Sequence, residues 1–191
     1  MTRRAFLVEY AKNIREVGAI APSSRYLAHK MCEPINFKDA KVIVEYGPGT
    51  GVFSSEIVKR MIPGTKLLVI ESNRAFHNKL RAQFQESDAV IVEHGNAQDV
   101  ATMLKKHRLA NPDVVVSGLP FAALPSEMSH AILSTTAELL ASNGAFVTFQ
   151  YTLLKKGLIG QYFNTIKTTR ELRNIPPAYI LHCQNTDHAQ L

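Results

Sequence analysis

VIVEYGPGTG, residues 42–51, decides the fold of this 191-residue chain. Its first half is apolar and β-branched, as in a strand buried on both faces. A carboxylate at Glu45 follows, and then Gly47, Gly49 and Gly51 open a helical pattern. Glycines let the backbone turn sharply and approach a ligand without a Cβ in the way. The stretch therefore predicts a strand, a ligand-binding turn and a helix.

Similar apolar runs alternate with helical patterns along the chain, which is typical of an α/β fold. Strands are predicted at 41–46, 66–71, 89–94, 113–118 and 144–151, and helices at 52–61, 74–85, 98–108 and 126–140. One more helix is predicted at 154–163, and two strands at 167–174 and 178–185, joined by a tight reversal. Five parallel strands followed by such a hairpin resemble the Rossmann-like fold of class I methyltransferases. That resemblance implies a mostly parallel seven-stranded sheet with an antiparallel C-terminal strand.

Length and composition indicate a single domain of ordinary globular character, with 46% hydrophobic and 20% charged residues. We expect residues 1–34 to form an N-terminal helical segment and residues 41–191 the Rossmann-like core. Cys32 and Cys183 are expected to be buried thiols rather than a disulfide. The seven histidines show no metal-ligand spacing, so no metal is predicted. No obligatory protein partner is evident.

The net charge of +6 is concentrated near the two ends of the chain. Residues 1–30 hold six Lys and Arg against two Glu, and residues 155–173 hold five against one. Basic ends predict a polyanionic partner, either nucleic acid or an anionic membrane surface, although solubility alone explains the charge equally well. The chain has no apolar stretch of about 18 residues and no secretory signal, so a cytoplasmic location is expected.

Two N-terminal helices are expected, one within residues 3–17 and one at 24–32 that begins after an N-cap in the segment APSS. The first carries apolar side chains at helical spacing, at Phe6, Tyr10 and Ile14. Such a basic amphipathic helix suits either of two roles. It can lie on anionic lipid, or it can pack as a lid over the ligand site.

The spacing of the three glycines, with Glu45 two residues before the first, resembles motif I of methyltransferases that use S-adenosylmethionine (AdoMet). The resemblance implies that Glu45 orients the methionine end of AdoMet, and that Tyr46, Gly47, Gly49 and Gly51 form the binding turn. Spaced glycines also occur in NAD and FAD sites. A NAD-dependent dehydrogenase is the main alternative, but the chain shows no second catalytic domain.

Two further segments fit AdoMet. Glu71, followed by Ser72, ends the second predicted strand, where a carboxylate can accept hydrogen bonds from both ribose hydroxyls. In related enzymes a Gly-Asp pair after the third strand contacts the adenine amine. Here Gly95-Asn96 occupies that place, so Asn96 and the following Ala97 are expected to bind the cofactor, with Asp99 as the fallback. Either polar residue could instead be only a helix cap.

The segment SGLPF (117–121) resembles the (N/D)-(P/L/I)-P-(Y/F) motif of amine methyltransferases, including the rRNA adenine dimethylases. In those enzymes the first residue holds the target amine and the aromatic ring stacks on the base. Here Ser117 replaces the amide or carboxylate and is expected to contact both cofactor and substrate. Pro120 and Phe121 are expected to shape a pocket for an ammonium group by cation–π contact. The alternative is a simple strand-to-helix turn.

Along nearly its whole length the chain resembles the bacterial phospholipid N-methyltransferases. The diagnostic segments are GAIAPSSRYLAHKM (18–31) and RNIPPAYI (173–180), beside motif I and the SGLP loop. The resemblance implies methylation of phosphatidylethanolamine towards phosphatidylcholine by an enzyme bound peripherally to the inner face of the cell membrane. An anionic membrane surface and an aminophospholipid are then the partners. RNA is the alternative partner, with rRNA adenine as substrate, but about forty residues after the fifth strand leave no room for an RNA-binding domain. A non-catalytic AdoMet-binding regulator is a third possibility.

Methyl transfer from a sulfonium is an in-line displacement that depends on positioning and on removal of water. A lipid ammonium must first lose a proton, so an acceptor or a water path is needed. Tyr151 is the predicted catalytic tyrosine beside Ser117, Pro120 and Phe121. The other candidate acceptors are Tyr26, Gln150, His94 and His130.

Overall fold

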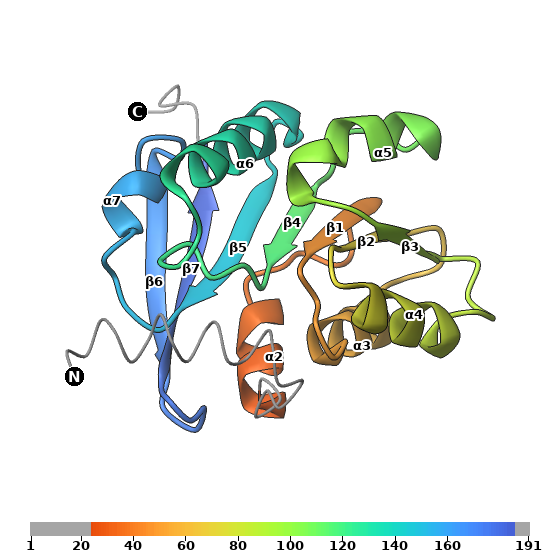
Figure 1. The fold of residues 1–191 in the computed structure, drawn as a ribbon, viewed down its shortest axis with the longest axis horizontal. Helices are drawn as coiled ribbons and strands as arrows, with labels where there is room; N and C mark the ends of the chain where they lie inside the picture. The colour runs from red at the N-terminus through yellow and green to blue at the C-terminus, as the bar shows by residue number, and fades with distance from the viewer. Residues whose placement is uncertain (1–23, 186–191) are drawn as a thin grey trace.

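The computed structural model describes residues 24–185, which form a seven-stranded sheet covered by helices on both faces (Figure 1). The strands are β1 (Val42–Tyr46), β2 (Lys66–Glu71), β3 (Val90–His94), β4 (Val114–Ser117), β5 (Ala145–Gln150), β6 (Thr165–Glu171) and β7 (Ala178–Gln184). The helices are α2 (Arg25–Cys32), α3 (Val52–Arg60), α4 (Arg74–Gln83), α5 (Val100–Lys106), α6 (Ser126–Leu139), α7 (Lys156–Ile159) and the short 3₁₀ helix η1 (Ala97–Asp99).

The strand order is β3-β2-β1-β4-β5-β7-β6. All neighbouring strands from β3 to β5 are parallel, whereas β7 runs antiparallel to both β5 and β6. This is the predicted Rossmann-like arrangement. The chain winds outward in both directions from β1 and β4, and open α/β sheets bind ligands at the carboxyl ends of the strands at such a switch point.

The core lies in two layers, one on each face of the sheet. In β1 the side chains of Val42, Val44 and Tyr46 pack into the layer that contains α5 and α6, whereas Ile43 packs against α2 and α3. This alternation follows from the two-residue period of a strand. Because both faces are covered, the central strands are continuously apolar, as predicted. The two edge strands differ, since most residues of β3 are half-buried and most residues of β6 are exposed.

Strand positions agree with the prediction to within a residue for β1 to β5, and β6 begins two residues earlier than expected. The predicted helix at 154–163 is wrong in length, because α7 contains only Lys156–Ile159. Glycines at 157 and 160 weaken a helix there. The predicted helix at 98–108 begins as η1 and becomes α5 only at Val100.

The second predicted helix is α2, and Ser24 is its N-cap, with the Oγ accepting a hydrogen bond from the Leu27 N–H. The predicted helix at 3–17 lies outside the described residues. No helix in the described part of the chain has the length and apolar character needed to cross a bilayer.

The start of α2 is joined to the turn between β6 and β7. The backbone N–H of Ser24 donates to Oδ1 of Asn174 (3.0 Å), and Nδ2 of the same side chain donates to the Pro176 carbonyl (2.7 Å). Asn174 is almost fully buried. The segments 18–31 and 173–180, which carry the family resemblance, therefore meet in space through residues 150 positions apart.

Candidate active site

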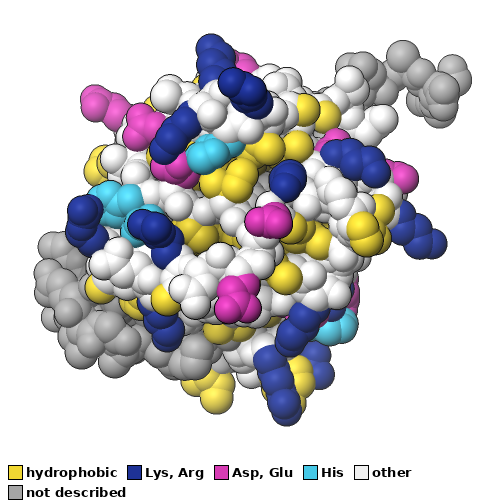
Figure 2. Space-filling view, turned by 90° about the vertical axis from the view of Figure 1, so that its right-hand side faces the viewer, with side chains coloured by type: hydrophobic (Ala, Val, Ile, Leu, Met, Phe, Trp, Pro, Cys, Tyr) yellow, Lys and Arg dark blue, Asp and Glu magenta, His cyan; other side chains and the backbone are white. Residues whose placement is uncertain are grey.

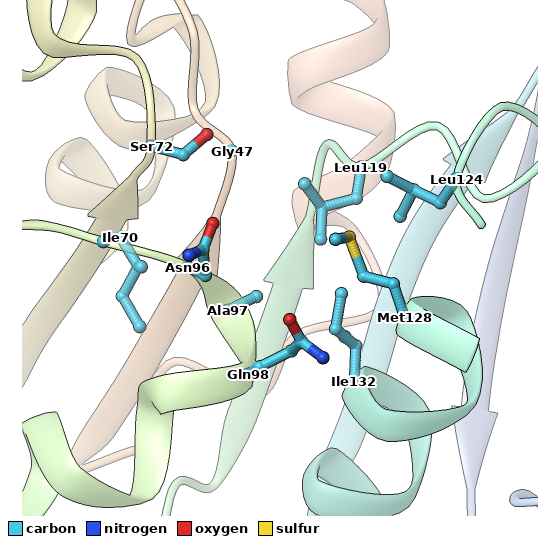
Figure 3. Close-up of a pocket in the computed structure, with 11 residues that line it drawn as sticks. Gly47, Ile70, Ser72, Asn96, Ala97, Gln98, Leu119, Leu124, Met128 and Ile132 are labelled. Atoms are coloured by element: carbon cyan, nitrogen blue, oxygen red, sulfur yellow. The ribbon is translucent and has the colours of Figure 1, made fainter. Parts of the chain in front are cut away.

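A cleft opens at the carboxyl ends of β1 to β4, where the turns after these strands meet (Figure 3). It encloses about 390 Å³ of space, part of which is open to solvent. Its lining comes from the glycine turn, the ends of β2 and β3, the loop after β4 and helix α6: Gly47, Ile70, Ser72, Gly95, Asn96, Ala97, Gln98, Leu119, Leu124, Met128 and Ile132. In Figure 3, Ser72 and Asn96 lie on one side, and Leu119, Leu124 and Met128 form an apolar wall on the other.

The glycine turn after β1 needs its glycines. Gly47, Gly49 and Gly51 all have positive φ, and Gly51 forms the N-cap of α3 in the left-handed conformation. A Cβ on Gly47 would also lie 2.8 Å from Cδ2 of Leu119. The loop after β4 is therefore packed directly on the turn, and the Gly118 N–H donates to the Tyr46 carbonyl (2.8 Å).

Glu71 holds the glycine turn against the end of β2. Its Oε2 accepts a hydrogen bond from the Gly49 N–H (3.0 Å), and its Oε1 accepts one from the Asn73 N–H (2.8 Å). The residue is only 5% exposed. A carboxylate has about four acceptor positions, so two backbone bonds leave capacity for the hydroxyls of a ribose.

Glu45 lies under the glycine turn and is fully buried. Ser54 of α3 donates a hydrogen bond from its Oγ to Oε2 (2.6 Å), but Oε1 has no hydrogen-bond partner among the described residues. Burial raises the pKa of Glu45 to about 8, against the opposing hydrogen bond from Ser54, and the charge of Glu71 raises it further. A buried carboxyl oxygen without a partner next to a glycine turn leaves a hydrogen-bonding position for a polar group of a ligand.

Tyr46 does not point into the cleft. Its side chain is buried on the opposite face of the strand from Glu45, and its hydroxyl lies 3.2 Å from Oγ1 of Thr136 in α6. Burial raises the pKa of this phenol to about 12. Only the backbone of Tyr46 lies beside the turn, so the prediction that Tyr46 forms part of the binding turn can apply to its backbone alone and stays a prediction.

Asn96 and Ala97 line the cleft, where the sequence placed them. The Asn96 side chain does not cap η1, although the residue stands at the N-cap position, so capping does not explain it. Asp99 stands at the N-cap of α5 without a side-chain capping bond and does not line the cleft.

The loop after β4 differs from the prediction at Phe121. This ring is fully buried, and it packs edge-to-face on Phe146 with 6.2 Å between ring centres. The Pro120 carbonyl accepts hydrogen bonds from the N–H groups of Ala123 and Leu124, so the chain turns here and carries the ring into the core. A buried ring cannot contact a headgroup by cation–π interaction, and Leu119 borders the cleft instead.

Ser117 is also buried, and its hydroxyl oxygen and its carbonyl oxygen each accept a hydrogen bond. Its Oγ accepts a hydrogen bond from the Leu119 N–H, and its carbonyl accepts one from Oγ1 of Thr148 (both 3.2 Å). Gln150 supports the same loop by donating from Nε2 to the Leu119 carbonyl (3.1 Å). Ser117 and Gln150 thus shape the loop.

The other candidate proton acceptors are dispersed. Tyr151 packs against Phe149, in the layer that contains α2. His94 contacts the carbonyl of Ser72 beyond β2, and His130 of α6 contacts the hydroxyl of Tyr162. Tyr26 lies at the start of α2, where a hydrogen bond from Arg25 lowers the pKa of its phenol.

Sequence reasoning missed the apolar wall of the cleft. Leu119, Leu124, Met128 and Ile132 were not predicted as site residues, although Met128 and Ile132 are four positions apart on one helix face. That spacing was a usable signal, but core packing produces it equally well.

Comparison with known proteins agrees with this geometry. The family model described as ribosomal RNA adenine dimethylase matches residues 23–162. The chain belongs to this family. Its fold is that of a class I methyltransferase, and the protein is an AdoMet-dependent N-methyltransferase with AdoMet as its cofactor.

One curated relative is an ornithine lipid N-methyltransferase of Singulisphaera acidiphila, 28% identical over 180 residues, which are 94% of each chain. Two solved structures share the fold. The N-methyltransferase NodS of Bradyrhizobium japonicum, in complex with S-adenosyl-L-homocysteine, has a TM-score of 0.70 at 9% identity and covers 92% of this chain and 98% of its own. A precorrin-6y C5,15-methyltransferase of Geobacter metallireducens has a TM-score of 0.66 at 16% identity, covering 84% of this chain and 88% of its own.

Proposed function

We propose that the methylated amine belongs to the headgroup of a membrane lipid, with phosphatidylethanolamine as the first candidate. The observation that carries this proposal is the burial of Phe121. In the motif that this loop resembles, an aromatic ring stacks on the adenine that is methylated at its exocyclic amine. In the loop 117–124 the sole aromatic ring is inside the core, and Leu119 borders the cleft in its place.

Two further observations support a lipid amine. Ser117 replaces the amide or carboxylate that grips a flat aromatic amine in base methyltransferases, and its hydroxyl already bonds the Leu119 N–H. The relative from Singulisphaera acidiphila, named an ornithine lipid N-methyltransferase, is matched over 94% of its length. We therefore keep an amino-acid lipid as the second lipid candidate. The family description favours rRNA adenine as the alternative acceptor.

The residues of the chain divide the work between cofactor and acceptor. AdoMet supplies a methyl group on a sulfonium. Glu71 would bind the ribose of the cofactor, and the glycine turn would lie against the part that joins the ribose to the methionine end. Glu45 would lie near the methionine end. The apolar wall formed by Leu119, Leu124 and Met128 would keep water from the reacting atoms, which favours displacement at the methyl carbon.

Methyl transfer with purified protein and radiolabelled AdoMet tests the proposal. Three acceptors should be compared: anionic vesicles that contain phosphatidylethanolamine, anionic vesicles that contain ornithine lipid in its place, and unmodified ribosomal RNA. We expect label in a lipid fraction and none in RNA. Label in RNA alone would overturn the proposal, and label in ornithine lipid alone would keep the lipid class and correct the headgroup.

The proposal places the enzyme at the inner face of the cell membrane, attached peripherally. Fractionation of cells that express the protein tests this. We expect it in the membrane fraction at low salt and in the soluble fraction after a high-salt wash, because binding to anionic lipid is screened by salt.

A further inference from the structure

Five large hydrophobic side chains are exposed in the described part of the chain, and all five lie in three neighbouring segments. They are Tyr26 (37% exposed) at the start of α2, Leu153 (39%) and Leu154 (70%) after β5, and Leu172 (65%) and Ile175 (84%) in the turn between β6 and β7. Single exposed apolar residues are ordinary, but confinement of all of them to one region is not.

The loop after β5 and the turn after β6 leave the sheet at the same end as the active-site cleft, and the start of α2 is bonded to that turn. Tyr179 of β7 pairs with Gln150 on one side and with Arg170 on the other, so β5 and β6 end at the same level. Both strands run parallel to β4, whose following loop borders the cleft. In Figure 1 the β6–β7 turn and α2 project at one end of the molecule.

The turn between β6 and β7 is held firmly, with its apolar side chains outward. Asn174 is buried and bonded to the start of α2, as described above. Arg173 is bonded to Glu171 (Nε to Oε1, 2.9 Å), and its guanidinium lies 4.3 Å from the centre of the Tyr26 ring. Leu172 and Ile175 flank these anchored residues and are exposed at 65% and 84%.

Basic side chains accompany the exposed apolar ones. Arg25 lies over Tyr26, Arg173 stands in the turn, and Lys155 and Lys156 follow the exposed leucines after β5. The nearby acidic side chains are in ion pairs: Glu171 is buried and pairs with Arg173, and Glu33 pairs with Lys30. Figure 2 looks onto the opposite side of the molecule, where β3 and α4 lie, and there basic, acidic and hydrophobic side chains are intermixed.

We propose that the β6–β7 turn, the start of α2 and the loop after β5 form a membrane-docking edge, which inserts Leu172 and Ile175 among the headgroups of an anionic bilayer. The proposal rests on the proposed lipid substrate and gives it a route to the cleft, since docking here turns the carboxyl ends of the strands toward the lipid. Exposed aliphatic side chains framed by Arg and Lys fit the boundary between headgroups and acyl chains. Leu172 and Ile175 offer no stacking platform for nucleic-acid bases, and the Tyr26 ring is already in contact with the guanidinium of Arg173.

The test is sedimentation of the full chain with vesicles of phosphatidylglycerol and phosphatidylethanolamine, without AdoMet, for wild type and for the double variant Leu172→Gln/Ile175→Gln. We expect the double variant to bind about tenfold more weakly, since two exposed side chains lose their apolar contact with lipid. A second variant, Lys155→Gln/Lys156→Gln, should weaken binding at low salt and lose the difference at high salt. The matched control, Lys79→Gln/Arg81→Gln on α4, should bind as wild type does.

Methyl transfer to phosphatidylethanolamine in detergent micelles separates this proposal from the lipid substrate itself. Unchanged transfer in micelles, with weakened binding and transfer on vesicles, supports the docking edge. Wild-type vesicle binding by the Leu172→Gln/Ile175→Gln variant overturns it, whatever the substrate. If no lipid is methylated at all, the substrate proposal fails, and the sedimentation result still decides whether this edge binds a bilayer. An unchanged melting temperature confirms that the variants are folded.

Discussion

Glu71 and Gly49, which are 22 residues apart, are joined by a hydrogen bond of 3.0 Å from the backbone N–H of the glycine to the carboxylate. The bond connects the end of β2 to the turn after β1. The same carboxylate accepts the Asn73 N–H, so it also fixes the start of α4. The site is therefore organised by one side chain before a nucleoside arrives, which lowers the ordering that binding requires.

Replacement of Glu71 by Gln should weaken AdoMet binding about tenfold to a hundredfold, because an amide turns one acceptor into a donor that faces a backbone N–H. Calorimetric titration with AdoMet measures this. Glu93→Gln is the matched control, since Glu93 pairs with Lys106 and His107 of the following helix region rather than with the glycine turn. Equal AdoMet affinities for the two variants would contradict a role for Glu71 in binding the cofactor.

Gly118→Ala should lower both stability and activity. An added Cβ would lie 2.6 Å from the Gly47 carbonyl, a backbone atom of the binding turn that cannot rotate away. We expect a loss of about 1–3 kcal/mol in the free energy of unfolding, with weaker AdoMet binding. Gly157→Ala in α7 is the control, because no atom lies within 4 Å of its added Cβ. Its stability should be unchanged or slightly higher in urea unfolding.

The stability of the protein should depend on the ionisation of Glu45. Burial raises the pKa of this carboxyl from 4.5 to about 8 in the folded state, so the folded chain binds its proton more tightly than the unfolded chain does. The resulting contribution to stability is complete below about pH 4.5 and is lost as the pH rises to about 8. Its size is on the order of a few kcal/mol.

Urea unfolding of wild type and Glu45→Gln at several pH values isolates this effect. The stability of the variant relative to wild type should rise with pH and level off above pH 8. Glu93 supplies a contrast of opposite sign. Burial acts to raise its pKa, but hydrogen bonds from Lys106 and His107 lower it overall, so its contribution is lost as the pH falls. If the difference in unfolding free energy between Glu45→Gln and wild type did not change with pH, it would contradict the raised pKa of Glu45.

Phe121→Leu should retain most of the methyl-transfer activity, whereas Phe121→Ala should destabilise the fold by about 3–5 kcal/mol. The reason is that this ring packs on Phe146 inside the core rather than in the cleft. Initial rates and melting temperatures of the two variants provide the measurement. A large loss of kcat in a well-folded Phe121→Leu variant would indicate instead that the Phe121 ring contacts the substrate.

The strands and the glycine turn were predictable because both depend on local sequence. Short apolar runs rich in β-branched residues favour strands that are buried on both faces, and the boundaries of β2 match the prediction. The orientation of Tyr46 and Phe121 was not predictable, since it depends on which face α6 covers and on how the loop after β4 folds back. The apolar wall of the cleft was missed for the same reason. Its residues have the same apolar character and spacing as core residues, and they differ from them only because their side chains face the cleft.

The position of β7 between β5 and β6 sets an order of assembly during synthesis. β6 is bonded to β7, and the strand order leaves it no direct pairing with β5, so residues 165–171 cannot join the sheet until 178–184 have emerged from the ribosome. Until then β5 is an open edge, with backbone groups available to another chain. The nascent protein therefore passes through a late stage that is prone to aggregation, and a chain stopped before Ala178 should remain at that stage.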